Sequence, residues 1–199
     1  MHITSTMVKE LREKTGAGIM DCKEALGASN GSMDEAIDYL RKKGLQAAAK
    51  RSARNTREGL VGSYIHAGGR LGVLVEVNCE TDFVARTDDF QELVRDLGMQ
   101  IAASHPRYVS RQEVPEVEIA KERHILEEQA KAAGRPAHII ANIVTGRLEK
   151  FYEDVCLLDQ PFVKNPDVSV EDMIKEKIAK VGENITVSRF TRFVLGEAS

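Results

Sequence analysis

The sequence predicts an α+β protein with a helical N-terminal module, a linking helix, and a core of helices packed on a small three-stranded antiparallel sheet. Two observations lead to this prediction. Residues 71–79 alternate strictly between one set of apolar residues and a mixed set, as a strand does. Most of the remaining chain repeats its apolar residues every three or four positions, as amphipathic helices do. We therefore divide the chain into residues 1–44, 45–58 and 59–199.

Residues 1–44 are expected to form three short helices. Their apolar stripes are Met7, Val8 and Leu11, then Met20, Ala25 and Leu26, then Met33, Ala36, Ile37 and Leu40. Gly16 is expected to end the first helix and Gly31 the second. Ser32 and Glu35 form a capping pattern at the start of the third helix, which we expect to end at Gly44.

Residues 45–58 form a basic, helix-prone linker. It follows a basic triplet at positions 41–43, and its own basic residues are Lys50, Arg51, Arg54 and Arg57. Two interpretations are open: a solvated linking helix, or a patch that contacts RNA or an acidic partner. The segment has no interleaved aromatic residues, which favours the linking helix.

The core segment begins with two strands, residues 60–66 and 71–79, joined by a glycine-containing turn into a hairpin. Residues 185–195 are rich in Ile, Val, Thr and Phe and supply a third strand. Helices are predicted between these strands, at residues 90–101, 112–133, 136–151 and 169–181, with turns on both sides of Phe162 and Val163. The stripe of the first of these helices is Phe90, Leu93, Val94, Leu97 and Ile101.

Residues 80–85 break the alternation of the preceding strand. The strand is expected to end here in a short loop, which presents the acid Asp82 beside the aromatic Phe83. Phe83 either covers the edge of its own core or forms an apolar wedge that enters a pocket of another protein. Pattern alone leaves both interpretations open.

Composition excludes several classes of protein. The 199 residues include 42% hydrophobic residues, but no apolar run is long enough to span a membrane, and the first residues do not resemble a secretory leader. A net charge of −3 argues against a general nucleic-acid binder. The three cysteines lack zinc-site spacing, so we expect a reducing, cytoplasmic environment.

The sequence also lacks the motifs of catalysis and cofactor binding. No phosphate-binding glycine loop is present, and the glycines at 68–69 lie in a hairpin turn. Cys22, Cys79 and Cys156 are either nucleophiles or inert thiols, and none has a nearby histidine in the sequence. His66 is either a base or a contact residue. We therefore expect a binding protein without a cofactor or catalytic site.

Four motifs resemble those of the bacterial translation elongation factor Ts family. They are VKELREKTGAGIMDCKEAL at 8–26, EVNCETDFVARTDDF at 76–90, GRLEKFYEDVCLLDQPFVKNP at 146–166 and GENITVSRFTRFVLGE at 182–197. The resemblance implies a guanine nucleotide exchange factor for protein biosynthesis. Such a factor binds elongation factor Tu carrying GDP and speeds GDP release, so that GTP can bind during translation elongation.

The resemblance also implies roles for particular segments. The N-terminal module is expected to be of the ubiquitin-associated type and to dock on the GTPase domain. The segment that displaces magnesium from the GTPase corresponds here to Thr81, Asp82, Phe83 and Val84. Phe83 would be the wedge, and Asp82 would add polar contacts.

Further partner contacts follow from the same resemblance. They are Ile19, Met20, Asp21, Cys22, Lys23 and His66. Met20 and Lys23 are expected to make direct contacts, although Met20 could instead pack inside its own module.

Longer members of the family carry two related core halves, and this chain has one. A homodimer that restores the pair would give a two-to-two complex with elongation factor Tu. The tail strand with Phe190, Phe193 and Val194 is one candidate interface, and the helix at 136–151 could instead extend toward the partner in a hairpin. Two other function classes are alternatives: an RNA-binding accessory protein using residues 41–57, and a thiol enzyme using Cys22 or Cys79.

Overall fold

A computed structural model describes residues 3–197 and has the predicted α+β architecture. The chain forms two compact units. The first contains the described part of residues 1–59 together with residues 78–93 and 172–186, and the second contains residues 60–77, 94–171 and the described part of 187–199.

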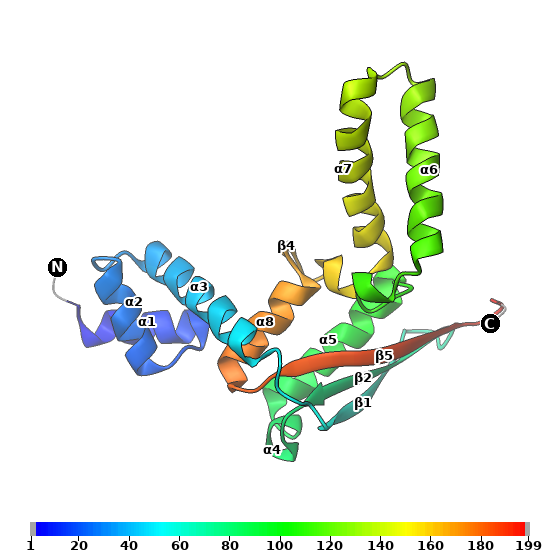
Figure 1. Cartoon of the computed structure of the whole chain (residues 1–199). Helices are drawn as coiled ribbons and strands as arrows, with labels where there is room; N and C mark the ends of the chain where they lie inside the picture. The colour runs from blue at the N-terminus through cyan, green and yellow to red at the C-terminus, as the bar shows by residue number, and fades with distance from the viewer. Residues whose placement is uncertain (1–2, 198–199) are drawn as a thin grey trace. The chain divides into compact units, whose positions relative to one another are not determined.

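The first unit begins with three packed helices, α1 (Ser5–Thr15), α2 (Ile19–Ala28) and α3 (Met33–Arg51) (Figure 1). Thr4 caps α1 by accepting a hydrogen bond from the Met7 amide at 3.3 Å, and Ser32 caps α3 by accepting one from Glu35 at 3.4 Å. The buried centre of this module consists of Leu11, Cys22, Ala25, Leu26 and Ala36. The predicted three-helix arrangement is therefore confirmed.

The predicted end of the third helix at Gly44 is wrong, because α3 continues to Arg51. Gly44 lies against α8 (Val170–Val181), and a Cβ added to it would lie 3.1 Å from the Cβ of Ala179. The glycine thus permits a close helix contact rather than ending a helix. The sequence cannot separate these two uses of glycine, because the approaching residue is distant in the chain.

The three-stranded sheet has the order β1 (Glu58–Ile65), β2 (Leu71–Cys79) and β5 (Ile185–Val194). The tail strand therefore pairs with β2, as Figure 1 illustrates. The alternation of β2 is confirmed, since Val73, Val75 and Val77 are buried and Leu74 between them is exposed. The face with the buried valines is the inner face of the sheet.

Helix α5 (Asp88–Ser104) buries the predicted apolar stripe. Its second-unit portion approaches β1 so closely that a Cβ at Gly62 would lie 2.2 Å from Val94 Cγ1. A glycine is therefore required at this position of the strand.

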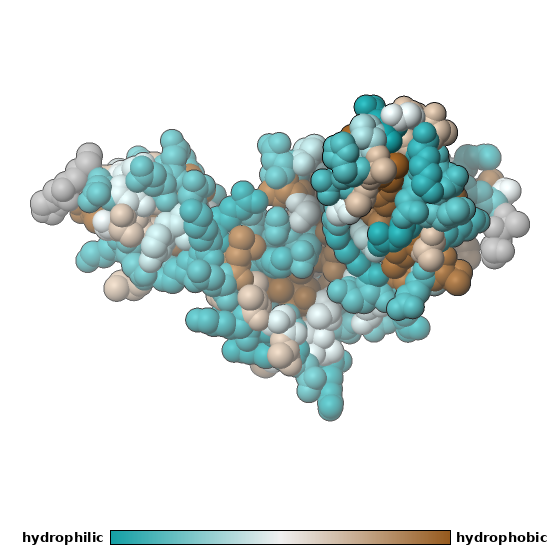
Figure 2. Space-filling view, turned by 45° about the horizontal axis from the view of Figure 1, so that its top comes forward, coloured by the Kyte–Doolittle hydropathy of each residue, from teal (hydrophilic) through white to brown (hydrophobic). Residues whose placement is uncertain are grey.

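The second unit also contains a helical hairpin. It consists of α6 (Glu116–Ala132) and α7 (Ala137–Val155), with the short 3-10 turn η1 (Arg111–Glu113) before it and η2 (Leu157–Asp159) after it (Figure 1). Leu126, Val144 and Leu148 fill the seam between the two helices. Figure 2 shows hydrophobic side chains flanked by hydrophilic ones on the hairpin. At its base, Arg111 donates to Asp159 at 2.7 Å.

The predicted turns around Phe162 and Val163 are partly wrong. Two short strands, β3 (Pro161–Phe162) and β4 (Asn165–Ser169), pair antiparallel with Pro161 opposite Ser169 and Phe162 opposite Asn165. The buried Gln100 holds this ribbon, because its Oε1 accepts the Val163 amide at 2.8 Å and its Nε2 donates to the Pro161 carbonyl at 3.2 Å. Strands this short have too few residues to show an alternation in the sequence.

Candidate functional site

The segment after β2 is a single helical turn, α4 (Asp82–Ala85), and not the loop that the sequence predicted. Thr81 has an extended backbone, and its Oγ1 accepts the Val84 amide at 3.5 Å, so it acts as the N-cap of the turn. Ala85 is buried and anchors the inner side of the turn. A four-residue helix shows too little periodicity to be recognised from sequence.

Phe83 points away from the protein on this turn. Its side chain is 79% exposed, whereas Phe90, seven positions later, is fully buried. The interpretation that Phe83 covers the edge of its own core is therefore wrong. A large exposed aromatic residue on a structured turn is the type of side chain that anchors protein interfaces.

Asp82 lies beside Phe83 and pairs with Arg86, whose Nη2 donates to Asp82 Oδ2 at 2.8 Å. Both side chains are largely solvent-accessible, at 48% and 78% exposure. Such a surface pair contributes less than about 1 kcal/mol to stability. Asp82 could therefore exchange this partner for a group on another protein at little cost.

The carboxylate of Glu183 supports the start of the α4 turn. It accepts hydrogen bonds from the Glu80 amide at 3.1 Å, the Thr81 amide at 3.0 Å and the Thr81 hydroxyl at 2.7 Å. Glu183 lies inside the fourth motif, at residues 182–197, but no local pattern predicts a role for it. The chain separation of 102 residues between Glu183 and Thr81 hides this contact from local patterns.

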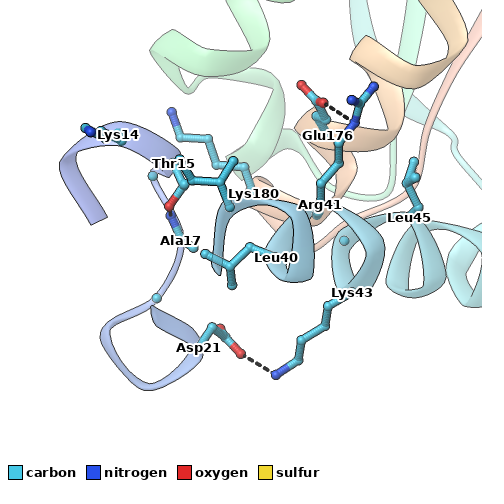
Figure 3. Close-up of a pocket in the computed structure, with 15 residues that line it drawn as sticks. Lys14, Thr15, Ala17, Asp21, Leu40, Arg41, Lys43, Leu45, Glu176 and Lys180 are labelled. Atoms are coloured by element: carbon cyan, nitrogen blue, oxygen red, sulfur yellow. Dashed lines mark hydrogen bonds and ion pairs between the residues drawn. The ribbon is translucent and has the colours of Figure 1, made fainter. Parts of the chain in front are cut away.

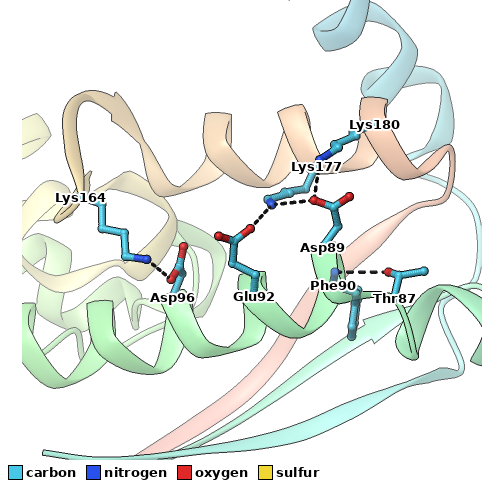
Figure 4. Close-up of polar contacts among 8 residues, drawn as sticks. All are labelled: Thr87, Asp89, Phe90, Glu92, Asp96, Lys164, Lys177 and Lys180. Atoms are coloured by element: carbon cyan, nitrogen blue, oxygen red, sulfur yellow. Dashed lines mark hydrogen bonds and ion pairs between the residues drawn. The ribbon is translucent and has the colours of Figure 1, made fainter. Parts of the chain in front are cut away.

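The start of α5 is fixed next to this turn. Thr87 Oγ1 accepts the Phe90 amide at 3.3 Å, and Asp89 accepts from Lys180 at 2.6 Å and from Lys177 at 3.3 Å (Figure 4). The hydrogen bond from Lys180, followed by that from Lys177, holds the pKa of Asp89 below its usual value. These contacts join the first turn of α5 to α8 within the first unit.

Helix α2 carries the second set of predicted contact residues. Met20 is 74% exposed and Ile19 is 55% exposed, and Lys23 is also exposed. The alternative in which Met20 packs inside its own module is therefore wrong. Cys22 instead faces the core of the module, where its side chain is fully buried, so it supports α2 from within.

Asp21 ties α2 to α3. The Lys43 ammonium donates to Asp21 Oδ1 at 2.9 Å and to Glu24 Oε2 at 2.7 Å. These bonds raise the pKa of Lys43, and the Lys43 bond, with a second bond from Tyr39, lowers that of Glu24. Asp21 and Lys43 also line a pocket of about 380 Å³ between the N-terminal helices and α8 (Figure 3). The network fixes the helix that presents Met20.

His66 belongs to the second unit, whereas the other predicted contact residues belong to the first. It is exposed at the end of β1, and its Nδ1 lies 3.0 Å from the Tyr64 hydroxyl. Its role as a contact to the partner stays a prediction.

Comparison with known proteins identifies the family. The family model described as "Elongation factor TS" matches residues 2–197. A relative named elongation factor Ts from Carboxydothermus hydrogenoformans is 62% identical over 195 residues, which cover 98% of this chain and 90% of the relative. Another of that name, from Fervidobacterium nodosum, is 57% identical over 197 residues, covering 99% of this chain and 100% of the relative.

The chain belongs to the elongation factor Ts family. Elongation factor Ts is the nucleotide exchange factor for elongation factor Tu, and the resemblance of the four motifs is thereby confirmed. The match extends over the α2 segment, the α4 turn and the helical hairpin alike.

Two arginines of the basic run at 41–57 form ion pairs with acids from other segments. Arg54 pairs with Glu80 at 3.4 Å, and Arg41 pairs with Glu176 at 3.6 Å. Both acids lie in the same unit as the run, and the helical part of the run is the end of α3. The predicted linking helix at 45–58 is not a separate element, because residues 45–51 continue α3 and residues 52–57 are not helical.

The thiols have the properties of structural cysteines. All three are free and buried. Burial raises the pKa of Cys79 and of Cys156 to about 11, so at neutral pH both are thiols and poor nucleophiles. Over residues 3–197 no cluster of His, Cys, Asp or Glu suits a metal ion. None of the helices in this range combines the length and the apolar composition that a membrane span needs.

Proposed function

We propose that this elongation factor Ts chain accelerates GDP release by inserting Phe83 into the GTPase domain of elongation factor Tu and displacing the partner's magnesium ion. The observation that carries this proposal is the 79% exposure of Phe83 on a turn that Thr81 caps, with the Thr81 amide held by the Glu183 carboxylate. Without magnesium, the phosphate charge of GDP is poorly neutralised, and the nucleotide leaves. Asp82 contributes polar contacts once it separates from Arg86.

In this proposal, the α2 segment docks on the GTPase domain. Met20 supplies a flexible apolar contact and Lys23 a charged one, and Ile19 extends the apolar surface. Residues 1–44 act as the docking module, 45–58 as the linker and 59–199 as the exchange and dimerisation core. His66 adds a contact near the nucleotide site.

The chain performs no covalent chemistry in this proposal, needs no cofactor of its own, and does not bind nucleic acid directly. The raised pKa values of the buried thiols and the ion pairs of Arg41 and Arg54 support these points. We place the protein in the cytoplasm, where buried free cysteines persist in reduced form.

The proposal is tested by loading elongation factor Tu with fluorescent GDP and magnesium and adding this chain in catalytic amounts. Stopped-flow fluorescence should record accelerated GDP release with the wild type, and little of that acceleration with the Asp82→Ala/Phe83→Ala variant. Equal acceleration by both proteins would remove the wedge role from the α4 turn. Release at the uncatalysed rate with the wild type would contradict the exchange function itself.

We also propose that two copies associate through the outer face of the sheet. Apolar residues are exposed there on all three strands or directly after them: Val61, Ile65, Leu74, Phe193 and Leu195. A shallow depression of about 470 Å³ lies over this face. Contiguous exposed apolar surface is typical of interfaces, and a self-complementary pair would cover it. The dimer would give a two-to-two complex with elongation factor Tu.

Phe193→Asp is expected to convert the dimer to a monomer, because it places a charge in the apolar interface. Phe193 is 62% exposed in the single chain, so the fold should be retained. Sedimentation velocity measures the change. Val117→Asp is the matched control, since Val117 is an apolar residue 80% exposed on α6 and not on the sheet. A wild type that sediments as a monomer, or a Phe193→Asp variant that remains a dimer, would contradict the proposed interface.

A further inference from the structure

We infer that Glu183 is the positioning residue of the exchange mechanism, because it fixes the α4 turn so that Phe83 meets the partner as a rigid wedge. This inference rests on the proposed function of Phe83. Glu183 lies between the end of α8 and the start of β5, and it acts through Thr81 rather than on the partner.

The hydrogen bonds of Glu183 use both of its carboxylate oxygens. Oε2 accepts the amides of Glu80 and Thr81, at 3.1 and 3.0 Å, and Oε1 accepts the Thr81 hydroxyl at 2.7 Å. Hydrogen bonds to an ionised acceptor are stronger than those between neutral groups. The Thr81 hydroxyl gives its only proton to Glu183 and keeps its lone pairs for the Val84 amide. A continuous chain of hydrogen bonds therefore runs from Glu183 to the turn that carries Phe83.

The residue after Glu183 is held equally firmly. Asn184 is 3% exposed, its amide donates to Glu80 Oε1 at 2.7 Å, and its Nδ2 donates to the Arg54 carbonyl at 2.9 Å. The two segments thus bind each other reciprocally: the Glu183 carboxylate accepts amides from residues 80–81, and the Glu80 carboxylate accepts the amide of Asn184. Residues 183–184 thereby tie the α4 turn to the segment that follows α3, and α3 packs with the helix that presents Met20.

A wedge needs this support because α4 is too short to be stable by itself. Isolated helices of this length do not form, since fixing the first turn costs more than its hydrogen bonds return. Phe83 is largely exposed and has few contacts of its own to hold it. If the α4 turn unfolded on contact, Phe83 would move with it and would not displace groups in the partner. Glu183 should therefore affect the maximal rate of GDP release more than the affinity.

The test uses the full chain with Glu183→Ala, Glu183→Gln and the control Glu116→Ala, which removes an exposed carboxylate of α6. In the free protein, amide hydrogen exchange at Glu80 and Thr81 should become at least about tenfold faster in Glu183→Ala. In stopped flow at saturating factor, the maximal rate of GDP release should fall about tenfold, with the half-saturating concentration within about twofold of the wild type.

Glu183→Gln should recover most of the maximal rate. Its Oε1 can accept the two amides, and its Nε2 can donate to the Thr81 hydroxyl once that group rotates. A merely structural role would instead lower thermal stability and affinity together in Glu183→Ala. If Glu183→Ala does not fold, Thr81→Val removes the hydroxyl, and with it both the bond to Glu183 Oε1 and the cap on the Val84 amide. This variant should also lower the maximal rate while leaving the half-saturating concentration unchanged.

The outcomes separate this inference from the proposed function. A wild type that does not accelerate release overturns the proposed function, and the inference with it. The inference alone is overturned if the wild type accelerates release and Phe83→Ala is slow, but Glu183→Ala is folded and as fast as the wild type. Loss of affinity without loss of maximal rate in Glu183→Ala, or in Thr81→Val where the alanine variant does not fold, also overturns it.

Discussion

Phe83→Ala is expected to slow the catalysed release of GDP from elongation factor Tu by roughly thirtyfold, the equivalent of about 2 kcal/mol. The ring is 79% exposed in the free chain, so its contacts form only in the complex. Interface aromatics that fill a pocket typically contribute this much. The thermal midpoint of the variant should match that of the wild type, because an exposed side chain contributes little to folding.

Stopped-flow fluorescence of labelled GDP at saturating factor measures this effect. Val117→Ala is the matched control, since Val117 is as exposed as Phe83 and lies on α6, outside the proposed contact segments. A Phe83→Ala variant that retains the wild-type rate would show that the exposed ring is not the exchange element. A lowered thermal midpoint would show that Phe83 supports the fold.

Phe90→Ala, unlike Phe83→Ala, should lower the free energy of unfolding, by about 3–5 kcal/mol. Phe90 is fully buried on the first turn of α5, so its removal leaves a cavity in addition to the lost transfer free energy. Urea unfolding followed by circular dichroism measures the change in the free energy of unfolding. Phe83→Ala serves as the control for the loss of a phenyl ring. A change below about 1 kcal/mol would contradict the buried packing of Phe90.

The elements that could be predicted from sequence are those in which local pattern and burial agree. The alternating valines of β2 and the stripe from Phe90 to Ile101 on α5 are buried as expected. The third strand was also predicted, because residues 185–195 offered the remaining strand pattern, whereas its pairing with β2 was not. Long, regular segments carry enough periodicity to determine both their type and their buried face.

The elements that were missed depend on contacts between distant segments. Gly44 lies inside α3 because Ala179 approaches it, and Gln100 holds the β3–β4 ribbon from another part of the chain. Within the candidate site, the sequence indicated Phe83 but left its exposure open. The role of Glu183 could not be predicted from local sequence patterns, because its hydrogen bonds to the α4 segment join residues more than a hundred positions apart. Partner contacts at Met20 and Lys23 remain predictions that exposure makes feasible.

The most direct test of the proposed exchange mechanism compares the affinity of this chain for nucleotide-free elongation factor Tu with its affinity for the form loaded with GDP and magnesium. Isothermal titration calorimetry gives both dissociation constants. Exchange by negative coupling predicts that the wild type binds the nucleotide-free form far more tightly, by roughly a thousandfold for a coupling of about 4 kcal/mol. The ratio should shrink in Phe83→Ala. A wild type that binds both forms equally, or a variant that keeps the full ratio, would contradict the claim that this turn opposes the bound nucleotide.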